Sequence, residues 1–368
     1  MSGKSLGIYV HIPFCDGKCN YCDFYSFKAK ADEYDVYTYQ ITKKVQKFSE
    51  LYTDKVVDTI YFGGGTPSVI GSDRIVKIIE SIFKAFKIAV GCEIAVEANP
   101  SSADNFDFSQ LKLAGVNRVS LGMQSAVDEE LKLLGRRHNR IDVINTVNRV
   151  IRSGIDNYSL DVMMGIPLQT KESLVTTLEF CKNIEAPHIS TYLLSVEPDT
   201  VFGRNFDKYN FADDDLQADL YSICSDHLKS RGYEHYEVSN FCKDNKFSRH
   251  NMRYWELKDY LGLGPSAHSL MDGKRFYYPR DILDFYDNKI IDDGVGNTTD
   301  EYIMLSLRTS KGIDIAELKL RLGGNLTEDF MRKIRVFSQQ GYVEADDKSI
   351  KLTEKGFLMS NAIIAELI

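Results

Sequence analysis

IYVHIPFCDGKCNYC, residues 8–22, joins an apolar run to three closely spaced cysteines. The apolar run is rich in Ile, Val and Tyr and predicts a strand over residues 7–13. Cys15, Cys19 and Cys22 follow with the spacing C-x3-C-x2-C, so their thiols share one loop directly after that strand. The other four cysteines are scattered and are expected to be reduced, mostly buried thiols. The crowding of three cysteines therefore needs its own explanation.

Strand-like and helix-like patterns alternate after this loop. Further strands are predicted over 57–65, 92–100, 116–124, 158–167 and 188–196, and amphipathic helices over 33–52, 72–86, 104–114, 127–152 and 171–184. In the second helix, one face carries Ile75, Ile78, Ile79, Ile82 and Phe83. Repeated strand–helix units imply a parallel sheet with helices outside. The fold class is therefore predicted as α/β, a partial (β/α)6 TIM-type barrel, with chemistry at the carboxyl ends of the strands.

Candidate functional residues fall at those strand ends. The three cysteines follow the first strand, Gly63–Pro67 the second, and Glu97–Pro100 the third. Gln124 ends the fourth strand, and Asp161 lies inside the fifth. We therefore expect residues from five strands to converge at one end of the barrel.

The remainder of the chain has a different organisation. Residues 200–290 are less regular, with a helix near 213–231 followed by aromatic-rich loops. Residues 298–368 show three helices, a β-hairpin turning at DDKS and a last helix, the pattern of a winged helix. The predicted domains are a barrel over 1–200, a barrel extension over 201–297 and a winged-helix-like domain over 298–368. An accessory role is favoured over DNA binding for the last domain.

Composition narrows the function classes. The 368 residues carry 45 Lys and Arg against 53 Asp and Glu, a net charge of −8, which argues against broad nucleic-acid binding. No run approaches 18 consecutive apolar residues, so a membrane span is not expected. The N-terminal stretch lacks the features of a signal peptide, and the expected compartment is the cytoplasm.

The three cysteines suit one kind of metal site best. Structural zinc takes four ligands, usually as two pairs, and no second pair is evident nearby. A disulfide at this spacing would be strained and is unexpected in the cytoplasm. Three thiolates suit a [4Fe–4S] cluster with one iron open to a small molecule. Zinc or coincidence stays the alternative on spacing alone.

The same motif resembles that of the radical SAM superfamily, in which an aromatic residue, here Tyr21, precedes the last cysteine. YFGGGTPS, VEANP, SLGMQS, LLGRRH and GIPLQT are similar to the coproporphyrinogen dehydrogenase (HemN-like) group, and EVSNF, SRHNMRYW and YLGLGPSAHS to its HemW heme chaperone branch. The resemblance covers nearly the entire chain. It implies a [4Fe–4S] cluster and S-adenosylmethionine (SAM), which the superfamily cleaves to a 5′-deoxyadenosyl radical.

The resemblance also assigns site residues. It implies that Cys15, Cys19 and Cys22 bind the cluster. The implied SAM-binding residues are Tyr9, Tyr21, Gly64, Gly65, Thr66, Glu97, Gln124, Arg136, Asp161 and Ser195. A carboxylate beside the SAM sulfonium is favourable, and an arginine can grip the SAM carboxylate in a bidentate manner. For Glu97 and Asp161, a solvated surface acid is the alternative on sequence alone.

Two departures separate this chain from the dehydrogenases. They carry a fourth cysteine two residues after the third, where this chain has Phe24, and a longer segment before the position of Tyr9. SRHNMRYW, residues 248–255, places a histidine near Tyr254 and Trp255. A neutral imidazole is a common axial ligand of heme iron, and aromatic side chains offer it an apolar wall. The resemblance makes His250 the expected heme ligand, with a buried structural histidine as the alternative.

Three other histidines are weighed against His250. His268 is a weaker rival ligand, His11 is expected to orient the cysteine loop, and His138 is interpreted as structural. The resulting hypothesis is a heme chaperone that delivers heme to acceptor hemoproteins such as respiratory enzymes. The resemblance allows a homodimer and transient membrane contact. The alternatives are an oxygen-independent coproporphyrinogen III dehydrogenase, disfavoured by Phe24, and a winged-helix nucleic-acid regulator, disfavoured by the acidic balance.

Overall fold

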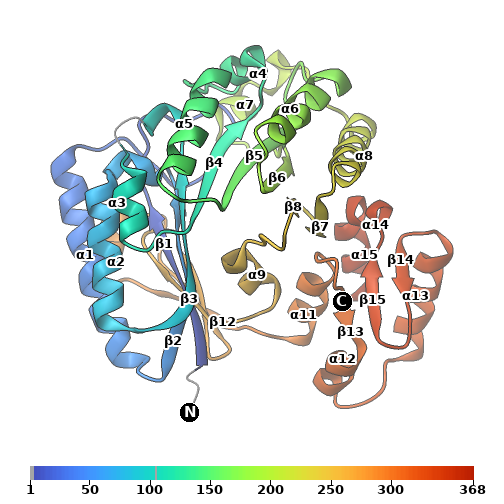
Figure 1. The fold of residues 1–368 in the computed structure, drawn as a ribbon. Coiled ribbons are helices and arrows are strands. Elements are labelled where there is room, and N and C mark those ends of the chain that lie inside the picture. The colour runs from blue at the N-terminus through green and yellow to red at the C-terminus, as the bar shows by residue number, and fades with distance from the viewer. Residues whose placement is uncertain (1–3, 104–105) are drawn as a thin grey trace.

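The computed structural model describes residues 4–103 and 106–368. Its main feature is a twelve-stranded sheet in the order β12-β11-β10-β9-β1-β2-β3-β4-β5-β6-β8-β7 (Figure 1). Six neighbouring strands are parallel and follow chain order, as predicted: β1 (Lys4–Ile12), β2 (Lys55–Gly64), β3 (Lys87–Ala98), β4 (Arg118–Gln124), β5 (Tyr158–Met164) and β6 (His188–Leu193). The predicted fold class, a partial barrel of α/β type, is confirmed.

Helices cover the outer face of the parallel strands (Figure 1). They are α1 (Ala31–Leu51), α2 (Ser72–Ala85), α3 (Phe108–Leu113), α4 (Asp128–Leu133), α5 (Arg140–Arg152) and α6 (Lys171–Asn183). The apolar face of α2 buries its four isoleucines, whereas Phe83 at its edge is 44% exposed, unlike the prediction. Of the helix predicted over 104–114, the first two residues lie outside the described residues.

The single helix predicted over 127–152 is wrong in its middle. The chain leaves α4 at Leu133 and enters α5 only at Arg140. Gly135 has φ +74°, a left-handed conformation that cannot continue a helix. The side chain of Asn139 then caps α5 by accepting a hydrogen bond from the Ile141 amide at 2.8 Å. The resulting loop carries Arg136 toward the carboxyl ends of the strands.

The loops predicted over most of 200–290 are also corrected by the structure. After α7 (Val201–Arg204) and α8 (Asp214–Ser230), this region adds short strands to both edges of the sheet. β7 (Glu234–Glu237) and β8 (Asn240–Cys242) extend the β6 edge. β9 (Tyr260–Leu263), β10 (His268–Met271), β11 (Lys274–Tyr277) and β12 (Ile291–Val295) extend the β1 edge, with α9 (Arg249–Trp255) and α10 (Ile282–Tyr286) between strands.

The last part of the chain forms a separate three-stranded sheet in the order β13-β15-β14. Its elements are α11 (Thr299–Ser306), β13 (Ile313–Asp314), α12 (Ile315–Leu322), α13 (Glu328–Gln339), β14 (Val343–Ala345), β15 (Ser349–Leu352), α14 (Glu354–Leu358) and α15 (Ser360–Leu367). Helices followed by a β-hairpin agree with the winged-helix pattern, although the domain limits stay predictions. Among the described residues, no helix is both long and apolar enough to cross a membrane.

Candidate functional site

A cavity of about 730 Å³ begins at the cysteine loop and runs into the interior of the half-barrel. This volume falls within the range of small-molecule sites. All but two of the residues predicted from the resemblance line it, namely Cys15, Cys19, Tyr21, Cys22, Gly64, Gly65, Thr66, Glu97, Gln124, Arg136, Asp161 and Ser195. Tyr9 and His250 are not among the lining residues. The fold thus brings together side chains that lie up to 180 positions apart in the sequence, the separation of Cys15 and Ser195.

The cysteine loop is held in place by hydrogen bonds to distant segments. All three thiols are free and half-buried. Cys15 Sγ lies 3.2 Å from the Thr66 hydroxyl. Asn20, between Cys19 and Cys22, donates from Nδ2 to the Leu133 carbonyl at 2.8 Å. These contacts fix the loop against the turn after β2 and the end of α4.

The arrangement of the three thiols is compatible with a multinuclear cluster. No group of three or more His, Cys, Asp or Glu side chains within residues 4–103 and 106–368 is placed to hold one ion. In a [4Fe–4S] cluster, each cysteine binds a different iron, so the sulfur atoms need not converge on one point. Burial raises the pKa of the Cys22 thiol, and a bound metal cation would favour its thiolate form.

The glycine-rich turn after β2 packs directly on the cysteine loop. The amide of Gly65 donates to the Ile12 carbonyl, and that of Thr66 to the Phe14 carbonyl, each at 2.8 Å. A Cβ on Gly65 would lie 2.5 Å from the Phe14 carbonyl oxygen, and one on Gly64, whose φ is +107°, would lie 2.6 Å from the His11 ring. The turn therefore needs glycine for packing, and the same feature exposes its backbone to the cavity.

Two carboxylates face the cavity below this turn. Tyr61 donates to Glu97 Oε1 at 2.7 Å, and Ser120 donates to Asp161 Oδ1 at 3.1 Å. Burial raises the pKa of Glu97 to about 7, and the charge of Asp161 adds to the increase. Burial raises the pKa of Asp161 to about 6, against hydrogen bonds from Ser120 and Ser190. A cationic ligand beside them would favour their ionised forms, as a sulfonium group would.

Arg136 and Gln124 lie beside the cysteine loop. Arg136 donates from Nη1 to Cys19 Sγ at 3.6 Å and from Nη2 to Asn99 Oδ1 at 3.0 Å, and its buried Nε has no partner among the described residues. Gln124 accepts a hydrogen bond from the Tyr192 hydroxyl and has φ +71°. Ser195 donates to Glu197 at 2.9 Å at the exposed end of the cavity. The guanidinium is thus positioned to meet an anionic group near the cysteines.

His250 lies outside this cavity in the first turn of α9. It is completely buried, with Nδ1 2.9 Å from the Thr59 hydroxyl and Nε2 2.9 Å from the Tyr254 hydroxyl. Its ring stacks on Tyr61, with 5.3 Å between centroids. Tyr9, whose ring centroid lies 6.4 Å from that of His250, belongs to the same aromatic group. Both ring nitrogens of His250 are therefore occupied in this conformation, and its role as an iron ligand stays a prediction.

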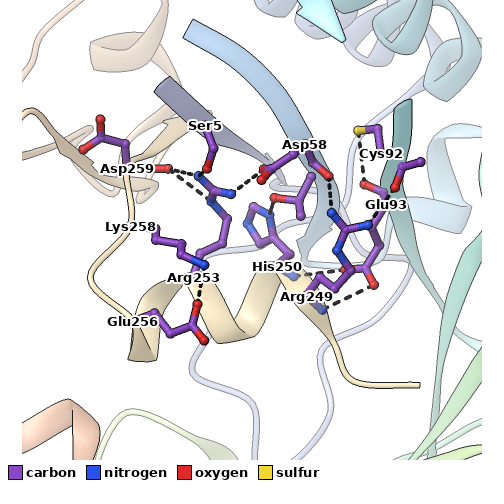
Figure 2. Close-up of polar contacts among 12 residues, drawn as sticks. Ser5, Asp58, Cys92, Glu93, Arg249, His250, Arg253, Glu256, Lys258 and Asp259 are labelled. Atoms are coloured by element: carbon purple, nitrogen blue, oxygen red, sulfur yellow. Dashed lines mark hydrogen bonds and ion pairs between the residues drawn. The ribbon is translucent and has the colours of Figure 1, made fainter. Parts of the chain in front are cut away.

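Helix α9 is held against the sheet by contacts with residues of β1, β2 and β3 (Figure 2). Glu93 accepts from the His250 amide at 3.0 Å and from the Arg249 amide at 3.3 Å. Buried Arg253 forms an ion pair with Asp58 and donates to the Ser5 hydroxyl at 3.0 Å. A second cavity of about 290 Å³, whose lining includes Thr59 and Met252, lies beside the helix. Thr59, which lines that cavity, lies between it and His250.

The structure also places the three other histidines that the sequence analysis weighed. His11 Nε2 lies 3.0 Å from the carbonyl of Tyr25, three residues after Cys22. His138 is buried, and its Nε2 lies 3.1 Å from the Met123 carbonyl, consistent with a structural role. His268 is exposed and stacks on Tyr277.

Comparison with known proteins agrees with this geometry. Residues 9–181 match the Radical SAM superfamily, and residues 299–359 match the HemN C-terminal domain. The protein called heme chaperone HemW in Bacillus subtilis is 31% identical over 368 residues, which cover 96% of this chain and 97% of the relative. The Escherichia coli HemW is 30% identical, with 98% and 97% covered. This chain belongs to the HemW family.

Structural comparison places the HemW-family chain in the same fold as a solved enzyme. The coproporphyrinogen III oxidase HemN from Escherichia coli superposes with a TM-score of 0.84 at 20% sequence identity, over 100% of this chain and 91% of HemN. Membership of the radical SAM superfamily implies a [4Fe–4S] cluster and SAM. The HemW-family chain has three thiols and a lined cavity that fit both groups.

Sequence reasoning missed the deep end of the cavity. Arg118, His188, Asn240, Ser248 and Asn251 line it but were not singled out as site residues. The sequence did contain a signal that could have identified Arg118. Side chains of a strand alternate between its faces, so Arg118 shares the inward face of β4 with Gln124, which was singled out.

Proposed function

We propose that this protein binds heme and delivers it to acceptor hemoproteins, with a [4Fe–4S] cluster and SAM held in the main cavity. Likeness over the full chain to proteins called heme chaperone HemW carries the proposal. In the proposed arrangement, Cys15, Cys19 and Cys22 hold the cluster. The SAM contacts are the remaining lining residues predicted from the resemblance, with Tyr9 behind them.

The parts of the SAM site have distinct tasks in this proposal. When bound, the cluster can supply an electron to the sulfonium of SAM. Arg136 would orient the SAM carboxylate near the cysteine loop, because it is already fixed through Cys19 and Asn99. Glu97 and Asp161 would hold the cationic and ribose part, and Thr66 would keep the glycine turn against Cys15.

Heme binding is assigned to the α9 motif. Burial holds the pKa of His250 at about 3, with Arg253 adding to the decrease, so the imidazole is neutral as an iron ligand must be. An iron ligand at Nε2 needs the tautomer with the proton on Nδ1, in which Nδ1 would donate to Thr59 and Nε2 would accept from Tyr254. Iron would take the place of the Tyr254 hydroxyl at Nε2, which requires the helix or that side chain to move.

An anaerobic heme titration of the cluster-reconstituted protein tests the proposal. Wild type, His250→Ala and His268→Ala are compared, the last being a matched control on an exposed histidine. We expect saturable binding near one heme per chain, weakened only in His250→Ala, and release of heme to apomyoglobin added afterwards. Weak binding that is equal in all three proteins would overturn it.

A second candidate is the dehydrogenation of coproporphyrinogen, supported by the fold shared with HemN. Phe24, at the position of the fourth cysteine, is 66% exposed and lines the cavity, so no thiol is available there. Product analysis under strict anaerobiosis separates the two candidates. Cytoplasmic location, a homodimer and transient membrane contact remain predictions.

A further inference from the structure

The main cavity continues below Glu97 and Asp161 to the amino-terminal ends of the strands. Along β4, the inward residues Gln124, Gly122, Ser120 and Arg118 all line it. At about 3.3 Å per residue, the offset from Arg118 to Gln124 corresponds to at most ~20 Å, because a register shift interrupts β4 between Leu121 and Gln124. The deep end, here called the floor, is lined by Arg118, His188 of β6, Asn240 of β8 and Ser248 just before α9. The floor thus lies well away from the cysteine loop.

Arg118 brings a positive charge to this floor and, among the described residues, forms no ion pair there; its charge acts over a longer distance on Asp161, whose pKa it lowers against the larger effect of burial. Only 2% of the residue is exposed, and Nη1 donates to Asn157 Oδ1 at 3.1 Å and to the carbonyls of Lys246 and Phe247. Within the described parts of the chain, Nε and Nη2 have no hydrogen-bond partner, and no ion pair joins Arg118 to a carboxylate. A buried guanidinium is costly unless an anion compensates it. One edge of Arg118 is therefore open toward the cavity.

His188 adds a neutral donor beside it. The residue is 1% exposed, and its Nε2 lies 2.8 Å from the Tyr236 hydroxyl. That hydroxyl accepts from the Ser248 amide, so its own proton points to Nε2 and leaves the ring proton on Nδ1. Burial, followed by the charge of Arg118, holds the pKa of His188 well below 6.5. Nδ1 is buried and has no partner among the residues that the structure describes.

Asn240 supplies a third polar group of the same kind. It is 7% exposed, and its Oδ1 also lacks a partner among the described residues. An amide can present either its oxygen or its NH2 group to a ligand by rotation about its last torsion. Buried polar groups in proteins are almost always paired, so unpaired groups on two neighbouring strands mark a place where a ligand supplies the partner.

We propose that the floor binds the carboxylate group of a small organic molecule that occupies the cavity below the SAM site. Nε and Nη2 of Arg118 form the planar pair of donors that a carboxylate accepts in a bidentate manner, and His188 Nδ1 donates to the same group. Water alone brings no negative charge to the guanidinium. A phosphate dianion is disfavoured relative to a carboxylate, because Asp161 on the wall above repels its two charges about twice as strongly as the single charge of a carboxylate.

The site fixes the direction of the ligand. With its carboxylate at the floor, the rest of the molecule extends upward toward Asp161, Glu97 and the proposed SAM site. The carboxylate belongs either to a propionate of heme or to a separate organic acid. Carboxylate binding at the floor does not depend on the α9 heme motif or on heme delivery. Only the assignment of the carboxylate to a heme propionate rests on the proposed function.

Two ligand pairs test the floor in cluster-reconstituted wild type, Arg118→Gln and the surface control Arg335→Gln. Hemin is compared with hemin dimethyl ester by absorbance titration, and propionate with propionamide by saturation-transfer NMR. Asn240→Asp is a second variant. It puts a carboxylate of the protein into the floor, which should exclude the carboxylate of a ligand while the existing hydrogen bonds of Arg118 are kept. We expect at least a tenfold preference for the free carboxylate in wild type and Arg335→Gln, lost in Arg118→Gln and Asn240→Asp.

The outcomes separate the two sources. A preference for hemin over its ester that depends on Arg118 assigns the floor to a heme propionate, and a propionate signal alone assigns it to a separate acid. Equal binding within both pairs, or a preference that survives both floor variants, would overturn the proposal. Hemin binding that is the same in all variants leaves heme delivery standing without the floor. An Arg118-dependent propionate signal without hemin binding leaves the floor standing without heme delivery.

Discussion

The hydroxyl of Tyr254 lies 2.9 Å from Nε2 of His250, and neither residue lines either cavity. Tyr254 lies four positions after His250 on α9, and its hydroxyl occupies Nε2, the nitrogen that would bind the heme iron under the proposed function. Under the proposed function, heme ligation at Nε2 and this hydrogen bond would exclude each other.

Tyr254→Phe should increase heme affinity. The substitution removes the hydroxyl that competes with iron but keeps the aromatic ring. Breaking this hydrogen bond costs a net free energy of about 1 kcal/mol in wild type, so its absence corresponds to roughly fivefold tighter heme binding. Absorbance titration with hemin measures it, with Tyr39→Phe, an exposed tyrosine, as the control. Weaker binding in Tyr254→Phe would show instead that the hydroxyl itself contributes to holding heme.

Each of Cys15→Ala, Cys19→Ala and Cys22→Ala should abolish cluster binding. Losing one of three thiolates leaves an iron without its protein ligand. After anaerobic reconstitution, we measure the iron and sulfide content. We also measure the broad absorbance expected for such a cluster at ~400 nm. Cys224→Ala, at a buried cysteine outside the loop, is the control and should keep both. Full iron and sulfide in the three loop variants would refute the cluster assignment.

Gly65→Ala should reduce cluster content although every cysteine remains. The added Cβ would lie 2.5 Å from the Phe14 carbonyl oxygen, so the backbone just before Cys15 must shift. Gly324→Ala is the matched control, because a Cβ there meets no atom within 4 Å. Iron content per folded chain is the measurement. Equal content in the two variants would mean that the turn does not support the cysteine loop.

Glu97→Gln should make the ligand-free protein relatively more stable at high pH. Wild-type Glu97 holds a proton up to about pH 7 in the folded state, whereas the unfolded chain loses it near the ordinary pKa of 4.5. Wild-type stability therefore falls as the pH rises from 4.5 to 7. The variant lacks this loss and should gain roughly 3 kcal/mol relative to wild type by pH 8.

Urea unfolding at pH 5 and pH 8 measures that difference. Glu344→Gln, an exposed glutamate, serves as the control and should show no pH-dependent gain. A gain of Glu97→Gln that is the same at both pH values would mean that the Glu97 carboxyl titrates normally in the folded protein.

Arg253→Gln should loosen α9. It removes the ion pair with Asp58 and the hydrogen bond to Ser5 and leaves Asp58 without its cation. We expect a loss of about 2–3 kcal/mol in unfolding free energy and faster hydrogen exchange over residues 249–255. The double variant with Asp58→Asn should recover part of the stability. Unchanged exchange in α9 would show that other contacts hold the helix.

Much of the barrel could be predicted from sequence because its signals are local. Six apolar runs separated by amphipathic helices specify a parallel sheet, and the direction of each strand fixes the end at which its polar residues gather. The predicted convergence of the cysteine loop, the glycine turn, Glu97, Gln124 and Asp161 on one cavity agrees with the structure. The positions at which helices break were harder to predict from the sequence. Gly135 interrupts an apolar pattern that continues on both sides of it.

The amino-acid sequence by itself determined the order of the six parallel strands, the loop that carries the three cysteines and the glycine turn beside it, since these depend on periodicity and on the direction of neighbouring segments. Only the tertiary structure decided that strands β7–β12 extend both sheet edges, that His250 is turned inward against Tyr254, and that Arg118 and His188 meet at the floor. Strands of three to five residues are too short to show a period. Local patterns report which face of an element is apolar, whereas contacts between distant residues are set by how the whole chain packs.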